Sequence, residues 1–203
     1  MKKTIHYPLV LAIIAALCVA GIDIVYSMVV DKIRLADKKK ALEAVCCIYK
    51  GCPVEQIETN QFDNKGDLVT WYKCSGGYAV IASAQGFDGA VTVMVGWDEK
   101  LEVVNGIFVL SHTETPGLGG NVDLVNSENT WLNVVNGTMK DETGKRPDFQ
   151  IQFNGVAADK AKLKKENGDI DALGGATITS QAVVNAVRKS YELMKLILEN
   201  ENK

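Results

Sequence analysis

A continuous apolar run near the start of the chain constrains the fold most strongly. From Pro8 to Val30 the sequence carries one charged side chain, Asp23. A helix of about 20 apolar residues is long enough to cross a hydrocarbon core of roughly 30 Å. A cleaved signal peptide is the alternative, since Lys2 and Lys3 precede the run and Ala20 suits a cleavage site. Because the apolar character continues beyond a usual signal peptide, we predict a retained transmembrane anchor within residues 1–31.

The charges in and around this run bear on partners and orientation. A carboxylate such as Asp23 costs about 2.5–3.5 kcal/mol in the middle of a span on insertion scales. It therefore either faces another helix, which would indicate neighbouring membrane subunits, or lies close to the outer interface. Two lysines precede the run, whereas five lysines and arginines follow between residues 32 and 40. Counted alone, these cations favour a cytoplasmic domain.

The remaining residues, 32–203, suffice for one globular domain with its own core. The net charge of −3 and the pI near 5.5 lack the basic footprint of a nucleic-acid-binding protein. His6 and His112 are the only histidines, so the chain offers little for a histidine zinc site or a Ser-His-Asp triad. We predict no metal site and no nucleic-acid partner.

Four cysteines follow the anchor, at positions 46, 47, 52 and 74. The spacing between Cys47 and Cys52 matches part of a ferredoxin motif without its remaining cysteines, which argues against an iron–sulfur cluster. A disulfide is compatible with an extracytosolic location, and free thiols are compatible with anaerobic conditions. Both states stay open at this point.

Hydrophobic periodicity predicts an α+β domain. Apolar residues at helical spacing predict helices over residues 33–48 and 178–199, and the stretch 122–135 suits a third. Alternating patterns bounded by turn residues predict strands at 68–74, 78–84, 91–97, 101–110 and 149–156. The linkers among the first four strands are too short for crossover helices, so the sheet is expected to be an antiparallel meander with flanking helices.

A small-residue motif stands directly before the last helix. The sequence DALGGATITS, from Asp171 to Ser180, combines two glycines and an alanine with three hydroxyl side chains. Its lack of bulk lets a planar or phosphorylated group approach, and the helix start supplies free N–H donors. The hydroxyls provide capping oxygens or an attachment point. On the residues alone, a plain N-cap after a glycine turn is the favoured interpretation.

A second motif, SHTETPGLG from Ser111 to Gly119, places a Pro-Gly turn after the predicted strand 101–110. Such a loop can surround a ring system, although a single Pro-Gly turn is more often only a turn.

Together the two motifs resemble those of the FMN-binding domain family, D-x-x-(S/T)-G-A-T and H-x-E-T-P-G-L-G. In that family the last threonine of the first motif is esterified to the phosphate of FMN, which implies a covalent FMN on Thr177. Gly174 departs from the family pattern, which has serine or threonine there. The expected cofactor contacts are Asp171, Gly174, Gly175, Ala176, Thr177, Thr179 and Ser180 in the first motif and Glu114, Thr115 and Leu118 in the second.

With its N-terminal anchor and compact length included, the whole chain resembles the G subunits of Rnf ferredoxin:NAD oxidoreductase complexes. The C subunits of Na⁺-translocating NADH:quinone reductases are similar. The resemblance implies an electron carrier without its own substrate site, partner membrane subunits, a flavin transferase for maturation and a domain on the extracytosolic side. That side conflicts with the cation count. A free-standing flavin reductase and a tethered anion-binding module are the remaining alternatives.

Overall fold

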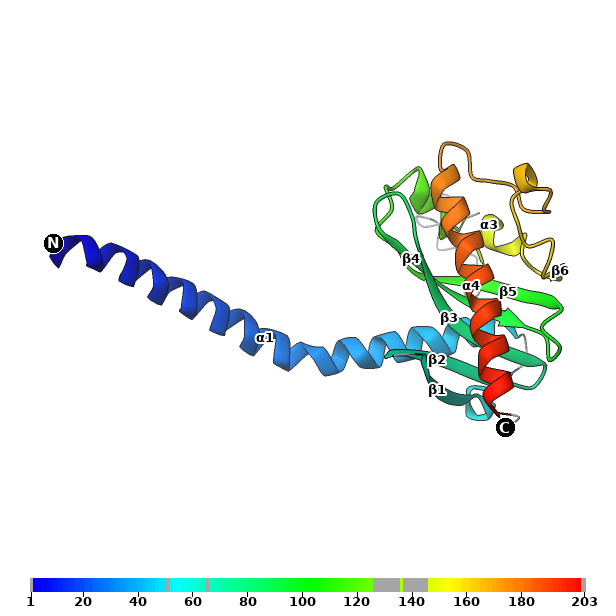
Figure 1. Ribbon diagram of the computed structural model, residues 1–203, viewed down its shortest axis with the longest axis horizontal. Helices are drawn as coiled ribbons and strands as arrows, with labels where there is room; N and C mark the ends of the chain where they lie inside the picture. The colour runs from blue at the N-terminus through cyan, green and yellow to red at the C-terminus, as the bar shows by residue number, and fades with distance from the viewer. Residues whose placement is uncertain (1, 50–51, 65, 126–135, 137–145, 202–203) are drawn as a thin grey trace. The chain divides into compact units, whose positions relative to one another are not determined.

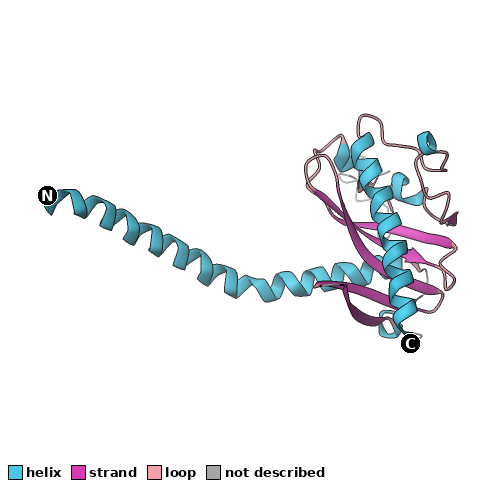
Figure 2. Ribbon diagram, in the orientation of Figure 1, coloured by secondary structure: helices cyan, strands magenta, loops and turns pink. Residues whose placement is uncertain are grey.

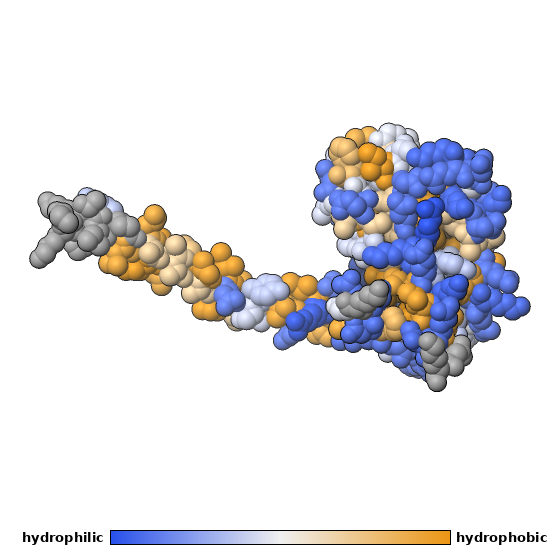
Figure 3. Space-filling model, viewed as in Figure 1, coloured by the Kyte–Doolittle hydropathy of each residue, from blue (hydrophilic) through white to orange (hydrophobic). Residues whose placement is uncertain are grey.

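A computed structural model describes residues 2–49, 52–64, 66–125, 136 and 146–201, which form two compact units, residues 1–40 and 41–203. The first unit belongs to helix α1, Lys2–Ile48. Residues from Leu9 onward form a candidate membrane span by length and composition. Apolar surface dominates this unit in Figure 3. The structure thus agrees with the predicted N-terminal span, although one unbroken helix covers both predicted helical segments. The predicted boundary at residue 31 stays a prediction.

The second unit is built on one antiparallel sheet whose six strands follow chain order (Figures 1 and 2). The strands are β1 (Glu58–Asn64), β2 (Asp67–Cys74), β3 (Gly77–Gln85), β4 (Ala90–Trp97), β5 (Val103–Ser111) and β6 (Val156–Ala157). Neighbouring strands among the first five are joined by short turns, as an antiparallel meander allows. The predicted α+β class and four of the predicted strands are confirmed. Strand β1 was not predicted.

Helical segments cover both faces of this sheet. Helix α4, Thr177–Glu201, buries Val183, Val187 and Met194 in a core with Val93 and Val95 of strand β4. The opposite face packs against the end of α1, where Ala44, Val45 and Ile48 meet Tyr72 and Met94. The alternation of side chains along each strand supplies both cores. The predicted helix 178–199 is confirmed as α4.

The predicted strand at 149–156 is wrong. Residues Asp148–Ile151 form the short helix α3, and only Val156 of that stretch joins strand β6. Pro147 precedes the helix, where its fixed φ and missing N–H are tolerated. Phe149 and Phe153, four residues apart, are both buried with ring centroids 5.7 Å apart. In a strand, residues four apart are about 13 Å apart along the chain, so this ring contact fits a helical turn and not an extended segment.

The predicted helix 122–135 falls mostly outside the described residues. Its first residue, Val122, ends the short 3₁₀ helix η2 (Gly119–Val122), and residues 126–135 are not described. Two further 3₁₀ helices are η1 (Val54–Gln56) and η3 (Lys164–Glu166).

A disulfide settles part of the cysteine question. Cys52, shortly after α1, is bonded to Cys74 at the end of β2, with a Cα–Cα distance of 6.7 Å. Cys46 and Cys47 are free. Within the described ranges, no group of three or more His, Cys, Asp or Glu side chains could hold a metal ion.

Candidate functional site

A pocket of about 330 Å³ opens where helix α4 begins. Three segments meet there: the turn between β3 and β4, the loop after β5, and the glycine turn that leads into α4. The lining residues are Phe87, Glu114, Thr115, Leu118, Gly119, Gly175, Ala176, Thr177, Ile178 and Thr179. Both sequence motifs therefore contribute to one cavity.

The first turn of α4 presents hydrogen-bond donors at the pocket wall. The first intrahelical bond of the segment runs from the Ser180 N–H to the Ala176 carbonyl, at 3.0 Å. The N–H groups of Thr177, Ile178 and Thr179 precede it, so they have no acceptor within the helix. They carry the positive end of the helix dipole. An anion beside the exposed Thr177 side chain would be stabilised by these donors.

The glycine turn before α4 needs its glycine at one position only. Gly175 has φ of +73°, in the left-handed region that favours glycine, and a Cβ there would lie 3.2 Å from Leu118 Cδ2. Gly174 has no positive φ, and a Cβ on it would meet no atom of the described residues within 4 Å. A serine or threonine side chain, which the family pattern has at this position, would therefore have room at Gly174. Contacts with neighbouring atoms do not require a glycine there.

Glu114 forms the inner wall of the pocket and is only 5% exposed. Its Oε1 accepts hydrogen bonds from the backbone N–H groups of Phe87, at 2.8 Å, and Asp88, at 3.3 Å. Its Oε2 accepts from the Thr179 hydroxyl at 2.6 Å. Both oxygens of the Glu114 side chain therefore act as hydrogen-bond acceptors for groups of the other two segments. It joins all three segments that meet at the pocket.

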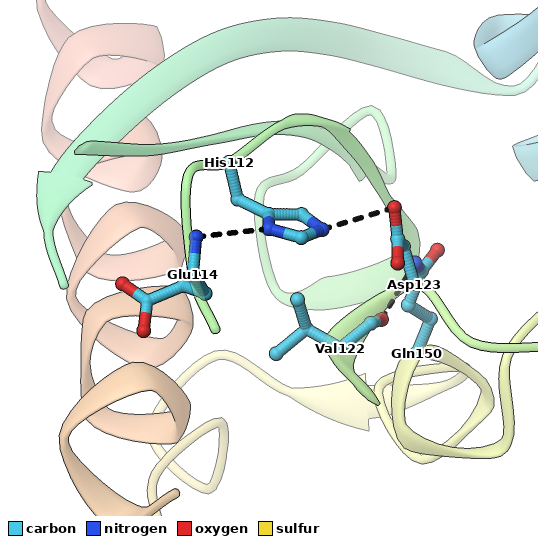
Figure 4. A network of polar contacts seen from close by, with 5 residues as sticks. All are labelled: His112, Glu114, Val122, Asp123 and Gln150. Atoms are coloured by element: carbon cyan, nitrogen blue, oxygen red, sulfur yellow. Dashed lines mark hydrogen bonds and ion pairs between the residues drawn. The ribbon is translucent and has the colours of Figure 1, made fainter. Parts of the chain in front are cut away.

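A histidine stands behind this carboxylate, on the far side from α4 (Figure 4). His112 Nδ1 accepts a hydrogen bond from the Glu114 backbone N–H at 3.2 Å. Its Nε2 lies 3.0 Å from Asp123 Oδ2. Because Nδ1 is an acceptor, the ring proton of the neutral imidazole lies on Nε2 and points to Asp123. The loop is held further along by Gln150, whose Nε2 donates to the Val122 carbonyl at 2.9 Å.

The outer rim of the pocket is apolar and exposed. Phe87, Leu118 and Ile178 are 68%, 48% and 55% exposed. Single exposed apolar side chains are common, but three around one pocket indicate a surface for an apolar ligand group. Thr115 adds polarity at the same rim, where its hydroxyl donates to Asp88 Oδ2 at 2.7 Å.

The structure brings seven of the ten predicted contact residues to this pocket and places three elsewhere. Ser180 is buried, accepts from the Leu173 N–H at 2.9 Å and donates to the Ala176 carbonyl, so it fastens the helix start. Asp171 forms an exposed ion pair with Lys164 at 2.6 Å. Gly174 is exposed beside the pocket but does not line it.

Three lining residues were not predicted, namely Phe87, Gly119 and Ile178. Gly119 and Ile178 sit inside the two motifs and could have been included with them. Phe87 lies in a separate turn, and no feature of the sequence marks it as part of this pocket.

The model of the FMN-binding domain family matches residues 86–192, a range that contains all three pocket segments. The chain belongs to the FMN-binding domain family. Among its relatives are proteins named as the G subunits of ion-translocating oxidoreductase complexes. That of Aliivibrio fischeri is 29% identical over 100% of this chain and 98% of its own. That of Shewanella oneidensis is 30% identical over 90% and 85%, and that of Methanosarcina acetivorans is 27% identical over 90% and 89%.

The pocket fits FMN in its chemistry. The free N–H groups at the start of α4 suit the phosphate, and the apolar rim suits the faces of the isoalloxazine ring. Thr177, the first residue of α4, is exposed and lines the pocket.

Proposed function

We propose that the protein is a membrane-anchored electron-transfer subunit of an Rnf-type ion-translocating oxidoreductase complex, with FMN joined through its phosphate to Thr177. One observation carries the proposal. In a chain of the FMN-binding domain family, the threonine that matches the attachment position is exposed at the first residue of α4 and lines the pocket. The names of the relatives support the G subunit of such a complex over the C subunit of a Na⁺-translocating NADH:quinone reductase.

The residues at the helix start would hold the phosphate end. The N–H groups of residues 177–179 would point to the phosphate charge, and Gly175 would leave its approach unobstructed. Formation of the ester joins Thr177 Oγ1 to phosphorus, releases the hydroxyl proton and expels a leaving group from phosphorus. The donor must therefore be an activated flavin nucleotide, such as a dinucleotide that releases a nucleoside monophosphate. We assign catalysis of this step to a separate flavin transferase, and Asp171, exposed nearby, is a candidate for its recognition.

The remaining pocket residues would orient the ring. FMN supplies the one- and two-electron redox chemistry, while the protein supplies binding, orientation and local charge. Leu118, Ile178 and Phe87 offer apolar contact, and Thr115 offers a hydroxyl. An ester keeps the flavin in place even if its affinity differs between redox states. The protein then works as an electron carrier between other subunits and needs no independent substrate site.

We further propose that the domain lies on the extracytosolic side of the membrane. The Cys52–Cys74 disulfide supports this side, because structural disulfides persist in oxidising compartments and are rare in the cytoplasm. The count of flanking cations points the other way. Alkylation of intact cells with a membrane-impermeant maleimide and a membrane-impermeant reductant decides between the two sides of the membrane. If the domain is extracytosolic, Cys52 and Cys74 resist the maleimide before reduction and react with it after reduction.

A gel experiment tests the attachment. The full chain is coexpressed with a flavin transferase, denatured and separated by electrophoresis. Wild type is expected to give a band with flavin fluorescence, and Thr177→Ala is expected to give none. Thr177→Ser keeps a hydroxyl at the same place and is the matched control, which should retain fluorescence. A fluorescent Thr177→Ala band would mean that the flavin is attached to another residue. A wild-type band from the native complex without fluorescence would mean that no flavin is covalently attached.

A further inference from the structure

We propose that Phe87 covers one face of the flavin ring and that Glu114 is the positioning residue that holds Phe87 there. This inference rests on the proposed function, since it places FMN in the pocket at α4. It assigns to Phe87 a contact outside both sequence motifs, and it gives Glu114 a role through another residue in place of direct contact with the ring.

The exposure of Phe87 is the first observation. A phenylalanine side chain buries about 150–250 Å² when covered, so leaving it 68% exposed forgoes a large hydrophobic contribution. Phe87 also lies beside Leu118 and Ile178 at the rim of a pocket. Aromatic side chains stack on planar rings in offset or edge-to-face geometry. A bound isoalloxazine would cover the phenyl ring and supply the missing contact.

The restraint on the turn that carries Phe87 is the second observation. The turn is closed by the Gly86 N–H, which donates to the Gly89 carbonyl at 2.7 Å. The backbone N–H groups of Phe87 and Asp88 both point to Glu114 Oε1. A charged acceptor makes such bonds stronger than neutral ones. The position of Phe87 is therefore set by a side chain 27 residues later in the chain.

Two glycines show how tightly the carboxylate is enclosed. A Cβ on Gly86 would overlap Glu114 Oε1, and a Cβ on Gly119 would lie 2.5 Å from Oε2 and 2.6 Å from Thr179 Oγ1. Real Cβ atoms essentially never approach so closely. Side chains at either position would push the carboxylate out of its place. The turn, the loop after β5 and the first turn of α4 thus close around Glu114 and leave it little freedom.

The first experiment measures how well the flavin ring is covered. Iodide quenching of flavin fluorescence and visible circular dichroism are recorded for the full chain with bound FMN. Phe87→Ala should raise the quenching constant at least about twofold, because one ring face loses its cover. Phe87→Trp should restore protection. Leu68→Ala is the matched control: Leu68 is 69% exposed, on strand β2 away from the pocket, and should change neither signal.

The second experiment separates positioning from charge. In Glu114→Gln the new side chain can still accept from the Phe87 N–H and still pair with Thr179, but it carries no charge. If Glu114 acts by positioning Phe87, Glu114→Gln keeps near wild-type quenching, whereas Glu114→Ala has a quenching constant like that of Phe87→Ala. The double variant Phe87→Ala/Glu114→Ala then has a quenching constant no higher than that of either single variant. If Glu114→Ala does not fold, Thr179→Val replaces it and should shift quenching in the same direction by less.

The outcomes are decisive in both directions. Unchanged quenching and dichroism in Phe87→Ala would overturn the contact. Glu114→Gln behaving like Glu114→Ala would overturn positioning and favour an effect of charge. Failure of the ester is separable: if denatured wild type carries no flavin, the same quenching series is run with added FMN on the folded chain. A Phe87 effect there would sustain this inference without the covalent bond.

Discussion

Loss of the Cys52–Cys74 disulfide is expected to lower the free energy of unfolding of the domain by about 3 kcal/mol. The bond closes a loop with a sequence separation of 22 residues. For a loop of that length the chain-entropy relation gives about 11 cal/mol/K, or about 3.4 kcal/mol at 25 °C. For a domain of this size, such a loss lowers the midpoint of thermal unfolding by about 7–13 °C. Both cysteines are buried, so their replacement also removes packing contacts.

The assay is urea unfolding of the full chain in detergent, followed by circular dichroism and carried out without flavin, because ligand binding adds its own stabilisation. Three samples are compared: the oxidised protein, the reduced protein and the double variant Cys52→Ala/Cys74→Ala. Cys18→Ala, at an exposed free cysteine of α1, is the control and should leave the midpoint unchanged. If all three samples unfold at the same urea concentration, the loop-closure reasoning is wrong.

Single residues carry three further predictions. Gly174→Ser should change the free energy of unfolding by no more than about 0.5 kcal/mol and keep full FMN loading, since its Cβ lies in open space. Gly175→Ser, at φ +73°, should lower the free energy of unfolding by about 1 kcal/mol or more, and equal urea midpoints for the two variants would refute this difference. Burial raises the pKa of the Tyr49 phenol above its ordinary value, so the stabilisation from the neutral phenol is complete below about pH 10 and is lost as the pH rises further. The urea midpoint of wild type should therefore fall above about pH 10. Tyr49→Phe should weaken that fall, and an unchanged fall in the variant would contradict the prediction. Asp23→Leu should reduce copurification of partner membrane subunits by about threefold, with Val25→Leu as control, whereas undiminished copurification would place Asp23 near the interface.

Most of the fold could be predicted from the sequence because its periodicities are strong. Residues 91–97 alternate between the two cores as expected of a covered strand. Strand β1, ETNQFDN, was missed because it is an edge strand with one large apolar side chain, Phe62, and so lacks an alternating signal. The stretch 149–156 was misread because two aromatics were taken as strand formers, although the preceding Pro147 suits a helix start.

The same contrast applies to the pocket. Thr177 and the glycine turn could be predicted, since the motif and the helix that follows are contiguous in sequence. Phe87 could not, because its place depends on hydrogen bonds to Glu114 across 27 residues. Ser180 was expected near the phosphate, yet its hydroxyl is committed to the backbone of residues 173 and 176. Local patterns identify a helix start, but only the fold shows which side chains face the cavity.

Attachment of FMN to Thr177 is tested most directly by mass spectrometry of the peptide spanning residues 166–188, taken from the protein matured in its native cells. We expect a mass increase equal to FMN less one water, with fragment ions that place it on Thr177. An unmodified peptide, or a flavin carried on Thr179 or Ser180, would contradict the proposed attachment.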